Sequence, residues 1–120
     1  MVALILADGD APTRDELDRG WPGWFDEIGL VIAADGGARH AGTLGVDIDL
    51  WVGDGDSLGD AGIAELAARG VAIERWPTDK DRTDTELAVL AAVQRDEGVV
   101  IVGAMGGERI DHALANVNLL

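Results

Sequence analysis

The stretch from Leu50 to Ser57 places two carboxylates directly after an apolar run. Asp54 and Asp56 are separated by a single glycine, and Gly53 precedes them. Where a strand ends in a turn, this spacing brings the two acids together, and the glycines leave room for a ligand. Two carboxylates held this close repel each other unless a cation lies between them. The pattern therefore predicts a hard divalent ion, above all Mg²⁺, which commonly brings phosphate with it. An ordinary Asp-Gly turn in an acidic protein is the structural alternative.

A second turn with an acid and glycines follows the apolar run from Leu30 to Ala34. Asp35 is followed by Gly36 and Gly37. Glycines between a strand and a helix allow the backbone to approach closely and offer N–H groups to a phosphate or a sugar. The full dinucleotide fingerprint G-x-G-x-x-G is absent. A tight strand-to-helix turn, capped by Asp35, is the alternative interpretation.

The segment before a predicted helix at Thr83 or Asp84 carries the third candidate turn. Asp84 could bring a third carboxylate to the metal at the start of this helix. Thr83 and Glu86 have the spacing of a capping box, which is a structural alternative for Thr83. Lys80 could neutralise phosphate charge, or it could be a solvated partner of the neighbouring acids.

The apolar runs predict five strands, and helices are predicted between them. The strands are expected at residues 2–7, 30–34, 49–52, 71–76 and 99–102. Thr13 is expected to cap the first helix and Ser57 a later one, from 58 to 69, while a last helix follows Arg109. This alternation predicts an α/β fold: a mainly parallel sheet with helices on both faces, a Rossmann-like three-layer sandwich. In such sheets ligands gather beyond the carboxyl ends of the strands, so the acidic and glycine-rich turns should meet along one rim.

The composition narrows the possible classes of protein. The 120 residues are expected to form one domain, and a net charge of −14 argues against nucleic acid or an anionic membrane as partner. Cysteine is absent, which excludes thiolate chemistry and fits a cytoplasmic location. The apolar start, residues 1–7, lacks a basic flank and is expected to be neither a signal peptide nor a membrane span.

Four motifs, in this order along the chain, resemble those of the catalytic domain of thiamine pyrophosphokinase. The resemblance implies transfer of pyrophosphate from ATP to thiamine, giving thiamine diphosphate and AMP, with Mg²⁺ required. The motifs are Ala34-Asp35-Gly36-Gly37-Ala38, Gly53-Asp54-Gly55-Asp56-Ser57, Lys80-Asp81-Arg82-Thr83-Asp84-Thr85-Glu86-Leu87-Ala88, and Gly106-Gly107-Glu108-Arg109-Ile110-Asp111-His112 continuing to Ala115-Asn116.

The resemblance also implies roles for individual residues. The metal carboxylates would be Asp54, Asp56 and Asp84, and Asp35 would support the same polar centre near the nucleotide phosphates. Arg109 resembles the family's phosphate-contacting arginine, with Asp111 as its acidic partner. Either Asp35 or Asp111 could accept the proton of the attacking hydroxyl group. The remaining candidates for nucleotide binding are Gly36, Gly37, Ser57, Lys80, Thr83 and Asn116.

The sequence departs from the family's pattern in two places. The family commonly has a bulky residue at the position of Gly55, and it lacks the inserted Glu108. The family's C-terminal β-sandwich, which with a dimer partner helps to form the thiamine site, does not follow residue 120. The chain is therefore expected to be the catalytic domain of a homodimeric parent, weakly active or inactive alone. The alternatives are another Mg²⁺-dependent pyrophosphokinase or phosphohydrolase, or an ATP-binding module without turnover.

Overall fold

The computed structural model describes residues 2–9, 11–77, 84–95 and 98–102. This part of the chain forms a five-stranded sheet in the order β4-β3-β2-β1-β5, and every neighbouring pair of strands is parallel. The predicted parallel α/β architecture is confirmed, and the last predicted helix lies outside the described residues. The strands are β1 (Val2–Leu6), β2 (Ile28–Ala34), β3 (Leu50–Gly53), β4 (Ala72–Arg75) and β5 (Gly98–Val102).

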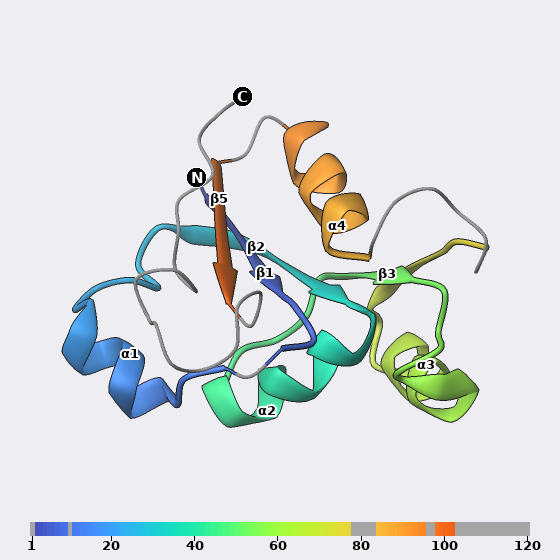
Figure 1. The fold of residues 1–120 in the computed structure, drawn as a ribbon, viewed down its shortest axis with the longest axis horizontal. Coiled ribbons are helices and arrows are strands. Elements are labelled where there is room, and N and C mark those ends of the chain that lie inside the picture. The colour runs from blue at the N-terminus through green and yellow to red at the C-terminus, as the bar shows by residue number, and fades with distance from the viewer. Residues whose placement is uncertain (1, 10, 78–83, 96–97, 103–120) are drawn as a thin grey trace.

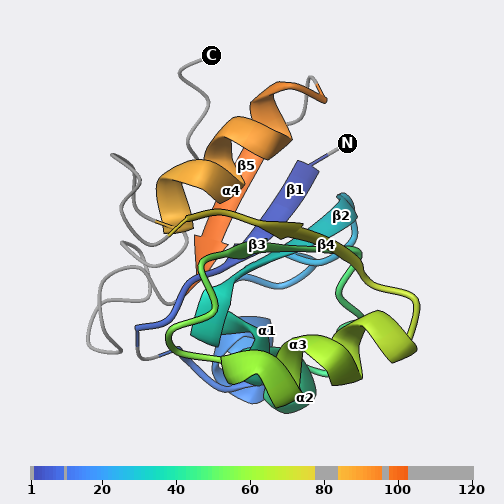
Figure 2. The same ribbon diagram turned by 90° about the vertical axis from the view of Figure 1, so that its right-hand side faces the viewer.

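Helices cover both faces of the sheet, as Figures 1 and 2 show. Helix α4 packs on one face, and α1, α2 and α3 lie on the other. The described helices are α1 (Arg14–Gly20), the 3₁₀ helix η1 (Asp35–Arg39), α2 (His40–Leu44), α3 (Gly59–Ala68) and α4 (Asp84–Val93). None of the helices in the described residues is both long enough and apolar enough to cross a membrane.

Alternation along the strands explains the two-sided burial. On β1, Ala3 and Ile5 pack in the cluster that contains α4, whereas Leu4 and Leu6 pack in the cluster that contains α1 and α2. Successive side chains of a strand point to opposite faces, so a strand buried on both sides must be apolar at every position. This is why a continuous apolar run, rather than an alternating one, correctly predicted β1.

The chain order brings the strand ends to one side. From β1 the connections step across β2 and β3 to β4, and α4 then returns over the opposite face to place β5 beside β1. We call the side at which the parallel strands end the carboxyl edge, and the opposite side the amino edge. Ligands of open α/β sheets bind at the carboxyl edge, so the turns located there are the candidate site.

Candidate active site at the carboxyl edge

The turn after β3, residues 54–57, is here called the acidic turn. Asp54 is half-buried and Asp56 is exposed. One carboxylate oxygen of Asp54 accepts a hydrogen bond from the backbone N–H of Asp56, 2.9 Å away. An aspartate that bonds the backbone two residues on forms an Asx turn, which fixes the direction of the following residue. The two carboxylates therefore belong to one ordered turn at the carboxyl edge.

A neighbouring aspartate holds this turn from inside the protein. Asp35 is only 2% exposed, and its carboxylate accepts the backbone N–H groups of Gly55 at 3.1 Å and Leu58 at 2.9 Å. The N–H of Ser57 lies at 3.4 Å from the same carboxylate. The alternative interpretation, in which Asp35 caps its own helix, is wrong, because no side-chain cap bond is formed there.

The same contacts correct a second prediction. Ser57 does not cap α3, because that helix begins at Gly59, Leu58 is its N-cap, and no side-chain cap bond is present. The Asp35 carboxylate, which follows β2, accepts the N–H groups of Ser57 and Leu58 just before the helix. Serine before an apolar helical pattern is a good local signal for a cap, but α3 begins two residues after Ser57.

Gly55 has a conformation and a neighbourhood that suit glycine. Its φ is +90°, a value that L side chains rarely adopt. A Cβ atom on Gly55 would lie 2.9 Å from Ile63 Cδ1 and 3.0 Å from a guanidinium nitrogen of Arg75. The guanidinium group of Arg75, the last residue of β4, thus occupies the space that a side chain at position 55 would need. Arg75 also donates to the Asp60 carboxylate, 2.9 Å away. Sequence analysis missed Arg75 because no motif contains it.

The glycines after Asp35 serve a close approach of two backbone segments. A Cβ on Gly37 would lie 1.9 Å from the carbonyl oxygen of Leu6, and one on Gly36 would lie 2.5 Å from an Asp8 carboxylate oxygen. Both glycines are buried in η1 against the end of β1. The prediction was a close approach to a ligand, whereas the neighbours that the structure shows are the Leu6 backbone and the Asp8 side chain. Phosphate binding by Gly36 and Gly37 stays a prediction.

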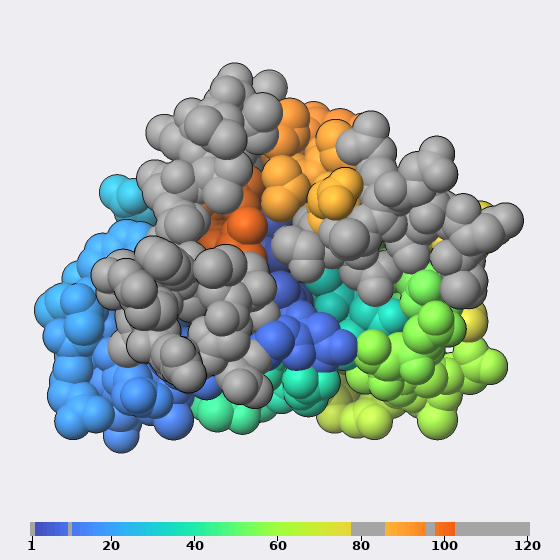
Figure 3. Space-filling view, in the orientation of Figure 1, coloured from blue at the N-terminus to red at the C-terminus, as the bar shows by residue number. Residues whose placement is uncertain are grey.

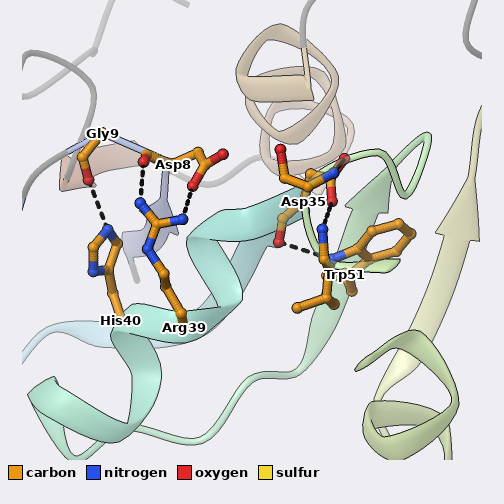
Figure 4. Close-up of polar contacts among 8 residues, drawn as sticks. Asp8, Gly9, Asp35, Arg39, His40 and Trp51 are labelled. Carbon is orange, nitrogen blue, oxygen red and sulfur yellow. Dashed lines mark hydrogen bonds and ion pairs between the residues drawn. The ribbon is translucent and has the colours of Figure 1, made fainter. Parts of the chain in front are cut away.

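A cluster that sequence analysis did not find joins the ends of β1 and β2 (Figure 4). Arg39 donates to the Asp8 carboxylate and, at 2.6 Å, to the Asp8 carbonyl oxygen. The His40 Nε2–H donates to the carbonyl oxygen of Gly9, 2.7 Å away, since a carbonyl group can only accept. His40, the first residue of α2, is half-buried and fixes this loop. The only sequence signal for this cluster was the position of Arg39 shortly after the Asp35-Gly36-Gly37 turn.

The ends of β1, β2 and β3 reach the surface side by side, from blue through teal to green in Figure 3. The amino-terminal end of α4 lies at the same edge in Figures 1 and 2, and α4 begins at Asp84, as predicted. Asp35, Gly36 and Gly37 are thus brought beside the acidic turn. The side chain of Asp84 is not among those described. Lys80, Thr83, Arg109, Asp111 and Asn116 lie outside the described residues.

Among the described residues, no three histidine, aspartate or glutamate side chains lie close enough together to hold a metal ion. The acidic turn alone supplies two carboxylates. A hollow of about 680 Å³ lies at the amino edge, lined by residues that include Val46, Leu66 and Arg69. It is remote from the acidic turn and offers no paired carboxylates, so we place the candidate site at the carboxyl edge despite the size of this hollow.

The fold and these turns define an open parallel α/β domain with an acidic turn, the candidate ligand site, at its carboxyl edge. Residues 23–120 match the family described as thiamin pyrophosphokinase, catalytic domain, and the chain belongs to this family. The sequence is 30% identical over 101 residues to thiamine pyrophosphokinase of Bacillus subtilis, covering 82% of this chain and 46% of that protein.

Solved structures give the same result. A thiamin pyrophosphokinase family protein from Enterococcus faecalis matches with a TM-score of 0.67 and 29% identity, over 93% of this chain and 50% of the other. Thiamin pyrophosphokinase from Geobacillus thermodenitrificans matches with a TM-score of 0.64 and 26% identity, over the same shares. The chain thus spans about half the length of the relatives it matches.

Proposed function

We propose that this chain is the catalytic domain of a cytoplasmic, homodimeric thiamine pyrophosphokinase. The reaction would be Mg²⁺-dependent transfer of pyrophosphate from ATP to thiamine, giving thiamine diphosphate and AMP. Membership of the family supports the reaction class. The observation that carries the proposal is the acidic turn, in contact with the Asp35-Gly36-Gly37 segment at the carboxyl edge. The acceptor site and the dimer contacts are proposed to need a C-terminal β-sandwich like that of the family.

The residues of the acidic turn fit Mg²⁺ in their chemistry. Carboxylate oxygens are hard donors, and Mg²⁺ in nucleotide sites is usually held by one or two carboxylates together with phosphate oxygens and water. A pair such as Asp54 and Asp56 is therefore sufficient, and Asp84 would add a third ligand. An acidic edge on a protein of net charge −14 would repel a triphosphate without such an ion. When bound, Mg²⁺ would supply positive charge against the phosphate oxygens of ATP.

The chain's own groups would bind the metal ion and orient the phosphates of ATP. Asp54 and Asp56 would hold the ion, and the Asp35 carboxylate keeps their turn in shape through its bonds to Gly55 and Leu58. The amino-terminal end of α4 at the same edge presents the positive end of a helix dipole, which favours phosphate. Arg109 would neutralise further charge. Little covalent work falls to protein groups in phosphoryl transfer, so positioning and charge account for most of the rate.

Product analysis tests the proposal. The full-length protein, given Mg²⁺, ATP and thiamine, should form AMP and thiamine diphosphate in equal amounts, and AMP should not form without thiamine. Formation of ADP or free phosphate would instead assign a phosphohydrolase or another transferase. Thiamine-independent AMP formation with another heterocyclic alcohol would indicate a different acceptor. Nucleotide binding without any product would leave an ATP-binding module.

The variant Asp56→Asn tests the metal role directly. Asn removes the charge of an exposed side chain but almost none of its volume, so the thermal midpoint should stay close to that of the wild type. Mg²⁺-dependent turnover should be lost. Asp47→Asn, an exposed acid at the amino edge, is the matched control and should retain full turnover. Undiminished turnover in Asp56→Asn would remove Asp56 from the metal site.

A further inference from the structure

Asp35 lies behind the acidic turn and is shielded from solvent. Its carboxylate is buried and directed at backbone N–H groups of residues 55, 57 and 58. We propose that Asp35 is a positioning residue, which forms the acidic turn before any metal or nucleotide binds. The functional part of this inference rests on the proposed function, and it assigns Asp35 to the shape of the turn instead of proton transfer or metal coordination.

The energetics of burial support this assignment. An ionised carboxylate removed from water must be compensated, and several N–H donors aimed at it provide that compensation. These donors belong to the segment that carries Asp54 and Asp56. Burial of the Asp35 carboxylate is therefore compensated only while the acidic turn keeps its observed conformation, with or without a bound ligand. Asp35 would affect ligand binding only through the conformation of this turn.

The backbone of Asp35 is itself held in place. Its φ of +44° is the only positive value among the non-glycine residues that the structure describes. A left-handed conformation costs an L residue about 1–2 kcal/mol. Two features accommodate it. The indole N–H of Trp51 donates to the Asp35 carbonyl oxygen at 3.1 Å (Figure 4). Gly53 lacks a Cβ, which would lie 3.0 Å from the Asp35 Cβ. β3 thus fixes Asp35, and Asp35 in turn fixes the turn that follows β3.

The structure also argues against Asp35 as the proton acceptor of the attacking hydroxyl group. A general base must come within hydrogen-bond reach of the proton that it takes. Asp35 is 2% exposed and its carboxylate accepts N–H groups of the acidic turn and Leu58, while Asp56 of the same site is exposed. Of the two candidates from the sequence, Asp111 is thus the one that we retain.

Amide hydrogen exchange in the metal-free protein tests the proposal. The amides of Gly55 and Leu58 should be protected in the wild type and should exchange about tenfold faster in Asp35→Asn, since the amide group cannot replace a charged acceptor for several donors. Asn has nearly the volume of Asp and tolerates positive φ. The matched control is Asp49→Asn: the Asp49 carboxylate accepts the Val31 N–H at 2.8 Å at the amino edge. This control should accelerate exchange at Val31 and leave the acidic turn unchanged.

Binding gives a second readout. Mn²⁺ alone should bind Asp35→Asn about tenfold more weakly than the wild type or Asp49→Asn, a loss of ~1.4 kcal/mol. In turnover, the KM for the metal–nucleotide complex should rise by a larger factor than kcat falls. A collapse of kcat with unchanged exchange at Gly55 and Leu58 would overturn the proposal, because Asp35 would then act on the substrate.

Further results distinguish the positioning role of Asp35 from a failure to fold and from a failure of the proposed reaction. If Asp35→Asn does not fold, exchange in the metal-free wild type still decides, because freely exchanging amides at Gly55 and Leu58 would mean that no turn is preformed. Trp51→Phe, which removes the bond to the Asp35 carbonyl, should give a smaller acceleration at the same amides. If the exchange and Mn²⁺ results are as expected and no AMP forms, the proposed reaction fails while the positioning role of Asp35 stands.

Discussion

The two edges of the sheet use carboxylates in different ways. At the carboxyl edge, buried Asp35 binds several N–H groups of one loop. At the amino edge, exposed Asp49 binds the single N–H of Val31. Fixing a loop costs conformational entropy for each residue ordered, so a loop needs more bonds than a strand such as β2, which the sheet already orders. The carboxyl edge therefore has the preorganisation that a ligand site requires.

The two ends of α3 show the same difference. Arg75 pairs with Asp60 in the first turn of α3, and Arg69 pairs with Glu65 near its end. Both pairs are exposed, and exposed pairs contribute little to stability. Arg75, however, also lies against the backbone of Gly55, whereas Gly70, beside Arg69, has nothing within 4 Å of the Cβ position. Of these two glycine positions, Gly55 is the more tightly packed.

The largest effect is expected for Gly37→Ala. The new Cβ would lie 1.9 Å from the carbonyl oxygen of Leu6, and backbone atoms of two elements would have to move. We expect a loss of about 3 kcal/mol in the free energy of unfolding, measured by urea denaturation. Gly42→Ala in α2 is the control, because nothing lies within 4 Å of its Cβ position. It should be neutral or slightly stabilising, and equal losses in both variants would contradict the packing difference.

Gly55→Ala should have the next largest effect. Gly55 and Gly70 share a φ of +90°, so alanine at either position is strained by about 1–3 kcal/mol. Only at Gly55 does the new methyl group meet Ile63 and Arg75. Both variants should lower the thermal midpoint, and only Gly55→Ala should weaken Mn²⁺ binding. A similar loss of Mn²⁺ affinity in Gly70→Ala would show that the effect is general destabilisation.

Thr13→Ala tests an exposed helix cap that lies outside the acidic turn. Thr13 and Glu16 form a capping box at the start of α1, in which the Thr13 hydroxyl accepts the Glu16 N–H at 3.1 Å. Loss of the cap should cost about 1 kcal/mol of unfolding free energy, and Thr13→Ser should restore most of it. Mn²⁺ affinity should be unchanged in both variants.

The same capping box has a pH dependence. The backbone N–H of Thr13, followed by its hydroxyl group, lowers the pKa of Glu16 below the ordinary value of 4.5. A carboxyl group with a lowered pKa in the folded state stabilises the fold above its unfolded pKa, and the contribution is lost as pH falls through the folded pKa. The difference in thermal midpoint between wild type and Glu16→Gln should therefore shrink below pH 4.5.

Arg75→Met should have the smallest effect. It removes a positive charge beside the acidic turn, so Mn²⁺ alone should bind about two- to threefold more tightly, and less so at high salt. Arg69→Met, at the other end of α3, should leave the Mn²⁺ affinity unchanged. Stability should change by less than ~1 kcal/mol in both variants. Equal changes in Mn²⁺ affinity would show that the charge of Arg75 does not act locally.

The sequence predicted the elements better than it predicted the contacts between them. Strands β1 to β5 lie within one or two residues of the predicted runs. The central strand β1 is buried on both faces and therefore apolar throughout, whereas the edge strand β4 ends in Glu74 and Arg75. The Thr13 cap was found because its partner is three residues away.

The contacts that sequence analysis missed join distant residues. Asp35 and Gly55 are 20 positions apart, and Asp8 and Arg39 are 31 apart. Nothing local distinguishes an aspartate that caps its own helix from one that holds a neighbouring turn. The choice depends on strand order, which brings β2 and β3 together and which the periodicity of the sequence does not encode.

The position of β5 has a consequence for synthesis of the protein. β1 is almost wholly buried, yet one of its edges pairs with residues 98–102, which leave the ribosome long after residues 2–6. Until then a nascent chain can pair β1, β2, β3 and β4, but the edge of β1 that pairs with β5 stays exposed. Translation must continue through Val102 before the sheet closes on that side, so we expect a chaperone that recognises exposed strands to act on the growing polypeptide.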